Sequence, residues 1–187
     1  DKTGQGFYKK TKKDGKTEIL TLDLDSMEYK PKTKPKFDTL EATKQISNLK
    51  ERVPVLLAGK DKAGEVYRDS FYGLFKYASN RIPEISDELY RIDQAVCTGF
   101  GWEIGPFETW DALGVKKTVE KMEEAGNKPN QWVYDMLDSG ADSFYKVEAG
   151  QKQYYDLDSK KYVNIPGTEE FIVLENLKES GKEVWSN

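Results

Sequence analysis

The chain has 187 residues, a formal net charge of −4 and 37% hydrophobic residues, with 8 Phe, 11 Tyr and 4 Trp. This length suits one domain or one and a half small ones, and the aromatic content indicates a buried core. The absence of histidine excludes Ser-His and Cys-His catalytic pairs, histidine-based zinc sites and a histidine general base. Cys97 is the single cysteine, so no internal disulfide can form, and we interpret it as a small buried residue in a reducing compartment.

Charge is distributed unevenly along the chain. Residues 1–60 carry a net charge of +5 and the remainder carries −9. The basic excess is densest in "KKTKKDGK" (9–16), where the Asp-Gly step indicates a solvated hairpin turn rather than a nucleic-acid site. Exposed lysines at such an edge protect a strand against aggregation. No run approaches the roughly 18 apolar residues of a membrane span. The single cysteine favours a cytoplasmic location. The hairpin interpretation of the basic segment leaves no nucleic-acid partner expected.

The first third of the chain predicts β structure followed by helices. Residues 6–31 are predicted to form short strands joined by turns at "KKDG" and "DS". Asp38 is the expected N-cap of a helix over 37–49, and Pro54 is expected to kink or interrupt the helical region. A longer helix is expected from about 65 to 80. Its expected apolar face consists of Val66, Phe71, Leu74, Phe75 and Ala78.

Proline and glycine divide the next part of the chain into four shorter helices. Their expected starts and stops are Ser86 (an N-cap), Gly99, Pro106, Gly114, Gly126, Pro129 and Gly140. Their expected inward residues are Leu89, Ile92, Val96, Phe107, Trp110, Leu113, Val115, Val119, Met122, Trp132, Val133, Met136 and Leu137. Residues 144–166 then return to the β pattern of the N-terminal segment.

Three segments of the chain recur in the same order. "GFYKK" (6–10) matches "SFYKV" (143–147), "LDLDSMEYKP" (22–31) matches "YDLDSKKYVN" (155–164), and "FDTLEATK" (37–44) matches "FIVLENLK" (171–178). The offsets of 137, 133 and 134 residues indicate duplication of a unit of about 134 residues. We therefore expect a fragment of a longer protein. Residues 1–36 would be the β tail of a truncated first repeat, and residues 37–187 a second helical repeat with a hairpin tail at about 143–166 and a C-terminal linker.

One stretch carries a family resemblance. "YRIDQAVCTGFGWEIGPFETWDALGV", with "GADSFYK" about thirty residues later, resembles the C-terminal helical domain of 3-hydroxyacyl-CoA dehydrogenases. "DKTGQGFYKK" resembles the end of such a domain, and "ENLKESGKEVWSN" the connection to an enoyl-CoA hydratase domain. The matching motif positions are Ile92, Asp93, Ala95, Gly99, Gly101, Gly105, Pro106, Phe107, Glu108, Asp111 and Gly114. The resemblance implies a mainly α helical array of the 6-phosphogluconate dehydrogenase C-terminal-like type, doubled as in multifunctional enzymes of fatty-acid β-oxidation.

The chain departs from this family at the groups that do chemistry. The resemblance implies NAD on a Gly-rich βαβ domain with a His-Glu pair, and neither feature occurs in this sequence. The family's Asn-Arg step, about 25 residues before the motif aspartate, falls at Arg68 and Asp69, whereas Asn80-Arg81 lies only 13 residues before Asp93. We therefore expect no catalytic, cofactor-binding or metal-binding residue in this chain, leave substrate-binding residues unassigned, and expect NAD on a missing N-terminal domain.

The remaining motif residues favour structural roles. Gly99, Gly101 and Gly105 are expected to allow tight turns and close helix packing rather than approach of a thioester. Trp102 and Trp110 favour core or interface over an acyl pocket. Glu103 and Glu108 favour capping or solvated roles over an acid–base pair, and Asp93 and Asp111 are expected to hold loop backbone.

Two functions are compatible with these features. In the first, the parent protein is an NAD-dependent 3-hydroxyacyl-CoA dehydrogenase that forms 3-oxoacyl-CoA. This fragment, inactive alone, would then pack against the missing first repeat and NAD domain as half of an internal pseudo-dimer, and would meet the acyl-CoA substrate only through the parent. In the second, the chain is a helical dimerisation or protein-interaction module that uses an apolar surface at Phe71, Phe75, Trp102 and Trp110.

Overall fold

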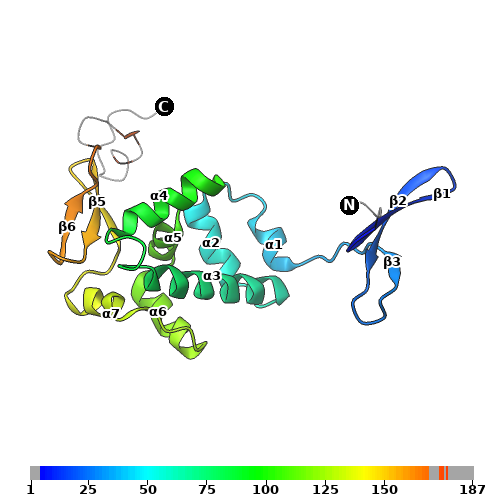
Figure 1. Cartoon of the computed structure of the whole chain (residues 1–187), viewed down its shortest axis with the longest axis horizontal. Coiled ribbons are helices and arrows are strands. Elements are labelled where there is room, and N and C mark those ends of the chain that lie inside the picture. Colours follow the sequence, from blue (N-terminus) through cyan, green and yellow to red (C-terminus); the bar gives the residue numbers. More distant parts are fainter. Residues whose placement is uncertain (1–4, 169–172, 175, 177–187) are drawn as a thin grey trace. The chain divides into compact units, whose positions relative to one another are not determined.

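A computed structural model of the chain describes residues 5–168, 173–174 and 176. The chain divides into two compact units, residues 1–36 and 37–187. The described residues form seven helices and two three-stranded sheets, a mainly α architecture with small β elements (Figure 1). None of the described helices has the length and apolar character needed to cross a membrane. The repeat segment 171–178 and the end segment 175–187 fall largely outside the described residues.

The first unit is an antiparallel sheet of order β1-β2-β3. Its strands are β1 (Tyr8–Lys13), β2 (Lys16–Leu22) and β3 (Tyr29–Pro31). Asp14 and Gly15 connect the first two strands with φ angles of 51° and 76°. Positive φ at both central residues matches the right-handed twist of a two-residue hairpin, and it is why Asp-Gly suits this turn. The solvated hairpin turn expected in "KKTKKDGK" is confirmed.

The second unit consists of helices followed by a second sheet. The elements are α1 (Asp38–Thr43), α2 (Leu49–Ala58), α3 (Lys62–Asn80), α4 (Leu89–Phe100), α5 (Pro106–Leu113), α6 (Val115–Glu124), α7 (Gln131–Asp138), β4 (Tyr145–Glu148), β5 (Gln151–Asp156) and β6 (Lys161–Asn164). The sheet has the antiparallel order β4-β5-β6. It contains the hairpin expected at about 143–166, formed by β4 and β5, and β6 extends it to a three-stranded meander.

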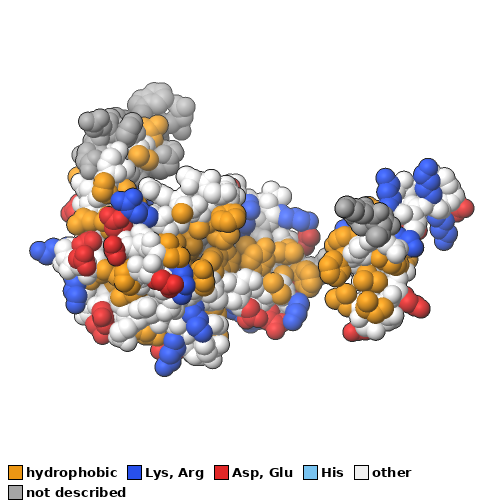
Figure 2. Space-filling model, in the orientation of Figure 1, with side chains coloured by type: hydrophobic (Ala, Val, Ile, Leu, Met, Phe, Trp, Pro, Cys, Tyr) orange, Lys and Arg blue, Asp and Glu red, His pale blue; other side chains and the backbone are white. Residues whose placement is uncertain are grey.

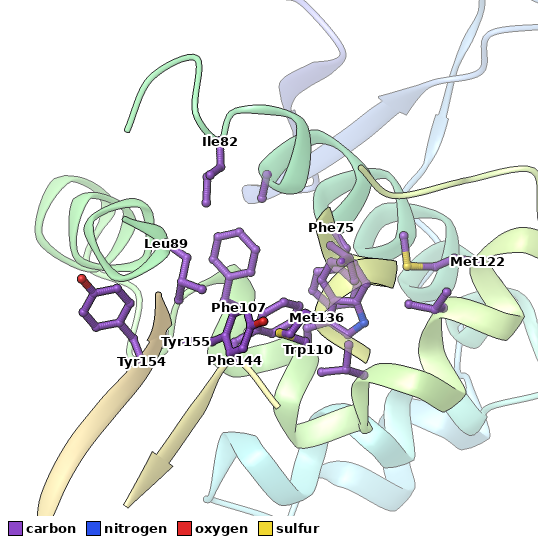
Figure 3. Packing of buried hydrophobic residues seen from close by; sticks show 14 of the residues in the cluster. Phe75, Ile82, Leu89, Phe107, Trp110, Met122, Met136, Phe144, Tyr154 and Tyr155 are labelled. Carbon is purple, nitrogen blue, oxygen red and sulfur yellow. The ribbon is translucent and has the colours of Figure 1, made fainter. Parts of the chain in front are cut away.

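Aromatic side chains from α3, α5 and the start of the second sheet form the centre of the core. Phe75 of α3 stacks on Trp110 of α5 with 4.8 Å between ring centroids, and Phe144 contacts Trp110 at 5.1 Å and Phe107 at 5.0 Å (Figure 3). All four side chains are fully buried. Such ring pairs add to the free energy gained from burial, so the second sheet is fixed to the helices through Phe144.

The helix expected over 37–49 is shorter than predicted, because α1 ends at Thr43 and α2 begins at Leu49. Phe37 is the N-cap of α1 and Asp38 its first residue, so the expected Asp38 cap is wrong. The side chain of Asn48 accepts a hydrogen bond from the N–H of Lys50 and begins α2. Pro54 lies inside α2 without ending it. The helix begins only five residues before Pro54, so the ring meets little more than the first turn.

The boundaries of α4 also differ from expectation. Ser86 does not cap it, because its Oγ accepts the N–H of Glu88 at 3.2 Å in a local turn and the helix begins at Leu89. Gly99 is helical, and the helix ends at Phe100. Its C-cap is Gly101, whose φ of 70° is the left-handed conformation that glycine favours at a helix end. The predicted start of α5 at Pro106 and its stop at Gly114 are confirmed.

Two predicted burial positions are wrong. Val66 is 52% exposed, because it lies nine residues, or two and a half turns, from buried Phe75 and so on the opposite face of α3. Cys97 is half-buried on α4 rather than enclosed in the core. Partial burial raises the pKa of its thiol, with the Glu108 and Asp93 charges acting in the same direction. A raised thiol pKa lowers its reactivity.

Candidate functional site

The motif aspartate Asp93 of α4 holds the N-terminus of α5. Its Oδ1 accepts the N–H of Phe107 at 2.9 Å and its Oδ2 accepts the N–H of Glu108 at 3.0 Å. The first N–H groups of a helix have no partner inside the helix, and the N-cap Gly105 has no side chain to serve them. Asp93 therefore caps α5 from a neighbouring helix, where its negative charge also meets the positive end of the helix dipole.

Gly105 is required at this contact because the two elements approach closely. A Cβ at this position would lie within the van der Waals radii of Asp93 Cα, Cβ and Cγ. Gly99, by contrast, has open space where a Cβ would lie and sits inside α4. Within this chain Gly101 has the positive φ of a tight turn and Gly105 a close contact, whereas no neighbouring atom requires glycine at Gly99.

A second motif aspartate, Asp111 of α5, holds the start of the second sheet. Its carboxylate accepts the N–H of Phe144 at 2.7 Å and the N–H of Tyr145 at 2.9 Å. The phenol of Tyr145 in turn donates to Asp93 Oδ2 at 3.1 Å. These bonds join α4, α5 and β4 in one largely buried network, in which both carboxylates fit a role of holding backbone.

Burial dominates the electrostatics of this network. It raises the pKa of Asp93 and of Asp111 to about 7, against the N–H donors, which favour the charged carboxylate. Burial also raises the pKa of the Tyr145 phenol well above its ordinary value, and the nearby Asp93 charge adds to this shift. Tyr145 therefore remains a neutral donor at physiological pH.

Glu108 forms an ion pair with Lys152 of β5, and both side chains are largely buried. The pair lines a cavity of about 240 Å³ together with Asp111, Tyr145, Lys146 and Val147. Glu103 lines a different cavity, so the structure does not bring Glu103 and Glu108 together as a carboxylate pair. With Lys152 already bound to it, Glu108 is poorly placed as a general base.

The second cavity lies beside the glycine-rich loop. It has a volume of about 380 Å³, and its lining includes the apolar residues Val53, Leu56, Phe71, Trp102 and Ile104. Trp102 is 43% exposed, whereas Trp110 is fully buried in the core. Phe75 is fully buried too, so the apolar surface expected at Phe71, Phe75, Trp102 and Trp110 is reduced to Phe71 and Trp102.

Arg68 occupies the position at which the family resemblance places a functional Asn. Its guanidinium donates to the carbonyl of Leu57 at 2.8 Å and to that of Gly59. These carbonyls lie at the C-terminal end of α2, where a cation is favourable. Arg68 therefore stabilises the end of a helix.

The described residues do not fit a nicotinamide dinucleotide or a metal ion. A dinucleotide site needs a parallel strand that leads through a Gly-rich turn into a helix, and both described sheets are antiparallel. Within the same residues, no three His, Cys, Asp or Glu side chains are grouped to hold a metal ion.

Sequence reasoning missed Tyr145 and Lys152 as members of the site. Both come from the second sheet and reach α4 and α5 across 52 and 44 residues, respectively. The only available signal was the "FY" step of "GADSFYK", whose N–H groups bind Asp111.

Comparison with known proteins agrees with the motif. A probable 3-hydroxyacyl-CoA dehydrogenase of Bacillus subtilis (strain 168) is 40% identical over 179 residues, which is 96% of this chain and 22% of that protein. A putative fatty acid oxidation complex trifunctional enzyme of Rickettsia felis (strain ATCC VR-1525 / URRWXCal2) is 25% identical over 103 residues, which is 55% of this chain and 13% of that protein. No protein-family model matches the chain, and no solved structure matches it. The predicted resemblance to 3-hydroxyacyl-CoA dehydrogenases is confirmed, and the chain spans less than a quarter of either relative.

Proposed function

We propose that this chain is a structural helical part of an NAD-dependent 3-hydroxyacyl-CoA dehydrogenase that acts in fatty-acid β-oxidation. In this proposal the whole protein oxidises a 3-hydroxyacyl-CoA to the 3-oxoacyl-CoA, with NAD held by another domain of the same cytoplasmic polypeptide. Residues 37–166 would support that machinery as one half of an internal pseudo-dimer, without a reacting group of their own.

The proposal is supported by the hydrogen bonds and the ion pair that the motif's polar side chains form within the fold. Asp93 and Asp111 each bind two backbone N–H groups, and Glu108 is paired with Lys152. Arg68, at the position of the family's Asn, binds carbonyl groups at the end of α2. A general acid or base must reach the substrate's reacting atoms, and these groups are occupied in holding the fold.

The proposal is tested by assaying two lengths of the protein. The complete polypeptide encoded by the gene should reduce NAD in the presence of 3-hydroxybutyryl-CoA, and the 187-residue chain should not. Activity in the 187-residue chain would contradict the structural role, and inactivity of the complete polypeptide would contradict the dehydrogenase assignment.

A second candidate function rests on the 380 Å³ cavity with its half-exposed Trp102. An apolar cavity beside an exposed indole also suits an interaction module or a retained acyl site. A tryptophan-fluorescence titration of the 187-residue chain with acetoacetyl-CoA, with free CoA as control, tests the acyl site. For a structural part we expect no saturable response up to about 1 mM, the weak end of useful affinity. Saturation that requires the acyl group would assign the cavity to substrate.

A further inference from the structure

The two sheets have the same strand register. The Tyr8–Thr21 pair of the first sheet corresponds to the Tyr145–Tyr154 pair of the second, at offsets of 137 and 133 residues. The two offsets differ by four residues, because the second hairpin is two residue pairs shorter. Removing whole pairs in even number keeps every side chain on its original face of the sheet.

Individual contacts recur at equivalent positions. The N–H of Leu22 donates to the carbonyl of Phe7 at 2.9 Å, and the N–H of Tyr155 donates to the carbonyl of Phe144 at 2.8 Å. A tyrosine hydroxyl likewise donates to a carbonyl in each sheet, from Tyr29 to Gly6 at 2.6 Å and from Tyr162 to Ser143 at 2.7 Å.

The turns and a cation–ring contact recur as well. Lys9 lies over the ring of Tyr29, as Lys146 lies over that of Tyr162. The second turns both contain a residue other than glycine with positive φ, 56° at Met27 and 54° at Lys160. Since positive φ is uncommon outside glycine, this agreement supports the equivalence of the two sheets outside the two extra pairs of the first hairpin.

The surroundings of the two sheets differ sharply. Phe144 is fully buried against Phe107 and Trp110, whereas the equivalent Phe7 is 70% exposed. Leu157 packs against the helical core, whereas the equivalent Leu24 is 67% exposed. Figure 2 shows hydrophobic side chains gathered on the first unit. The first sheet thus presents to solvent the side chains with which its counterpart binds helices.

We propose that the open end of the first sheet, defined by Phe7, Tyr8 and Leu24, is the docking surface for a helical body built like residues 37–143. In that body an aromatic pocket receives Phe7, and a carboxylate accepts the N–H groups of Phe7 and Tyr8. Asp111 and the Phe107–Trp110 pocket do the same for Phe144 and Tyr145.

The occupant is a separate helical body, because in residues 37–187 the equivalent place is filled by the second sheet. We assign it to another segment of the longer polypeptide. The matched part is only 22% of the Bacillus subtilis relative, which leaves ample length for such a body. The assignment of this helical body to the same polypeptide rests on the proposed function. The aromatic pocket and the carboxylate expected in it are inferred from the contacts of the second sheet.

Hydrogen exchange measured on two lengths of the protein tests the inference. In the complete polypeptide encoded by the gene, the amides of Phe7 and Tyr8 should exchange at least ~100-fold more slowly than in the 187-residue chain. The amides of Phe144 and Tyr145 are the internal control and should be protected in both. Equal exchange of Phe7 and Tyr8 in the two lengths, or a gene product no longer than these 187 residues, would overturn the inference.

A substitution gives a second readout. Phe7→Lys should lower the Tm of the complete polypeptide by roughly 5 °C or more and leave that of the 187-residue chain within about 1 °C, because the site is enclosed only in the former. Thr17→Lys, at the exposed turn end of the same hairpin, is the matched control and should leave both unchanged. An equal effect of Phe7→Lys on both lengths would contradict docking. Dehydrogenase activity is measured separately, so a protected but inactive polypeptide would refute the proposed function and leave the docking surface standing.

Discussion

The family motif contains two regions with opposite surroundings. Asp93, Gly105 and Asp111 lie in a buried network that joins α4, α5 and the second sheet. Trp102, only three residues from Gly105, lines an open apolar cavity. Both regions lie in the one stretch that carries the resemblance, whereas burial and hydrogen-bond partners separate them. The comparison teaches that the polar groups of the buried region hold the fold, whereas the Trp102 side chain is left partly open to solvent.

Removal of the Asp93 carboxylate should have the largest effect. Asp93→Ala leaves two backbone N–H groups and the Tyr145 hydroxyl without their acceptor in a buried place. We expect a loss of about 3–5 kcal/mol in the free energy of unfolding, measured by urea denaturation. Asp87→Ala, at an exposed position six residues earlier, is the control and should cost less than about 0.5 kcal/mol. Similar losses for both variants would show that the network does not dominate stability.

Replacing two glycines of the motif by alanine should change the free energy of unfolding in opposite directions. Gly105→Ala places a methyl group against Asp93 and should cost about 2–3 kcal/mol. Gly99→Ala fills open space inside α4 and should stabilise the protein by up to about 1 kcal/mol through helix propensity. Thermal unfolding of the two variants of the 187-residue chain measures both effects, and a destabilising Gly99→Ala would contradict the open space around Gly99.

The buried carboxylates should also make stability depend on pH. Their pKa of about 7 in the folded protein exceeds the value of 3.8 expected when unfolded, so the folded state binds these protons more tightly. The stability that they contribute is therefore full below about pH 4 and is lost as the pH rises toward about 7. Urea midpoints should fall between pH 5 and pH 7.5. Asp111→Asn, although less stable, should flatten that slope, and an unchanged slope would show that other groups cause it.

The loop should show the smallest effect on stability. Trp102→Ala removes a 43% exposed indole and should cost less than about 1 kcal/mol. Trp110→Ala, the matched change in the core, should cost about 3–5 kcal/mol. Urea denaturation of both variants measures how much the loop and the core each contribute to the free energy of unfolding. Comparable losses would mean that the loop belongs to the folding core after all.

Local signals predicted α5 and α6 well, whereas α7 begins at Gln131 with Asn130 as its N-cap rather than at the expected Pro129. Proline at a helix start and glycine after a helix end act through their own backbone geometry, so α5 and α6 follow from the sequence. The break between α1 and α2 was missed because apolar spacing continues through it. Asn48, the N-cap of α2, marks the break, but asparagine is also a common loop residue, so the sequence alone did not reveal it.

The site was less predictable than the fold. The aspartates could be recognised as holders of backbone, but their partners could not be named, because Tyr145 and Lys152 arrive from a distant sheet. The burial of Trp110 on the inward face of α5 was predicted, whereas the solvent exposure of Trp102 was not, since its place in a loop does not show what covers it. These properties arise only when separate elements pack.

The difference in length between the two hairpins has a practical consequence for labelling. Two pairs of residues are present in one hairpin and absent from the other, and both turns still use two consecutive residues with positive φ, Asp14–Gly15 and Ala149–Gly150. The tip at Ala149–Gly150 is therefore a natural place for a genetically inserted tag or reporter. An insertion there that adds equal numbers of residues to β4 and β5 would carry the label outward into solvent. The strand register that holds Phe144 in the core would be retained.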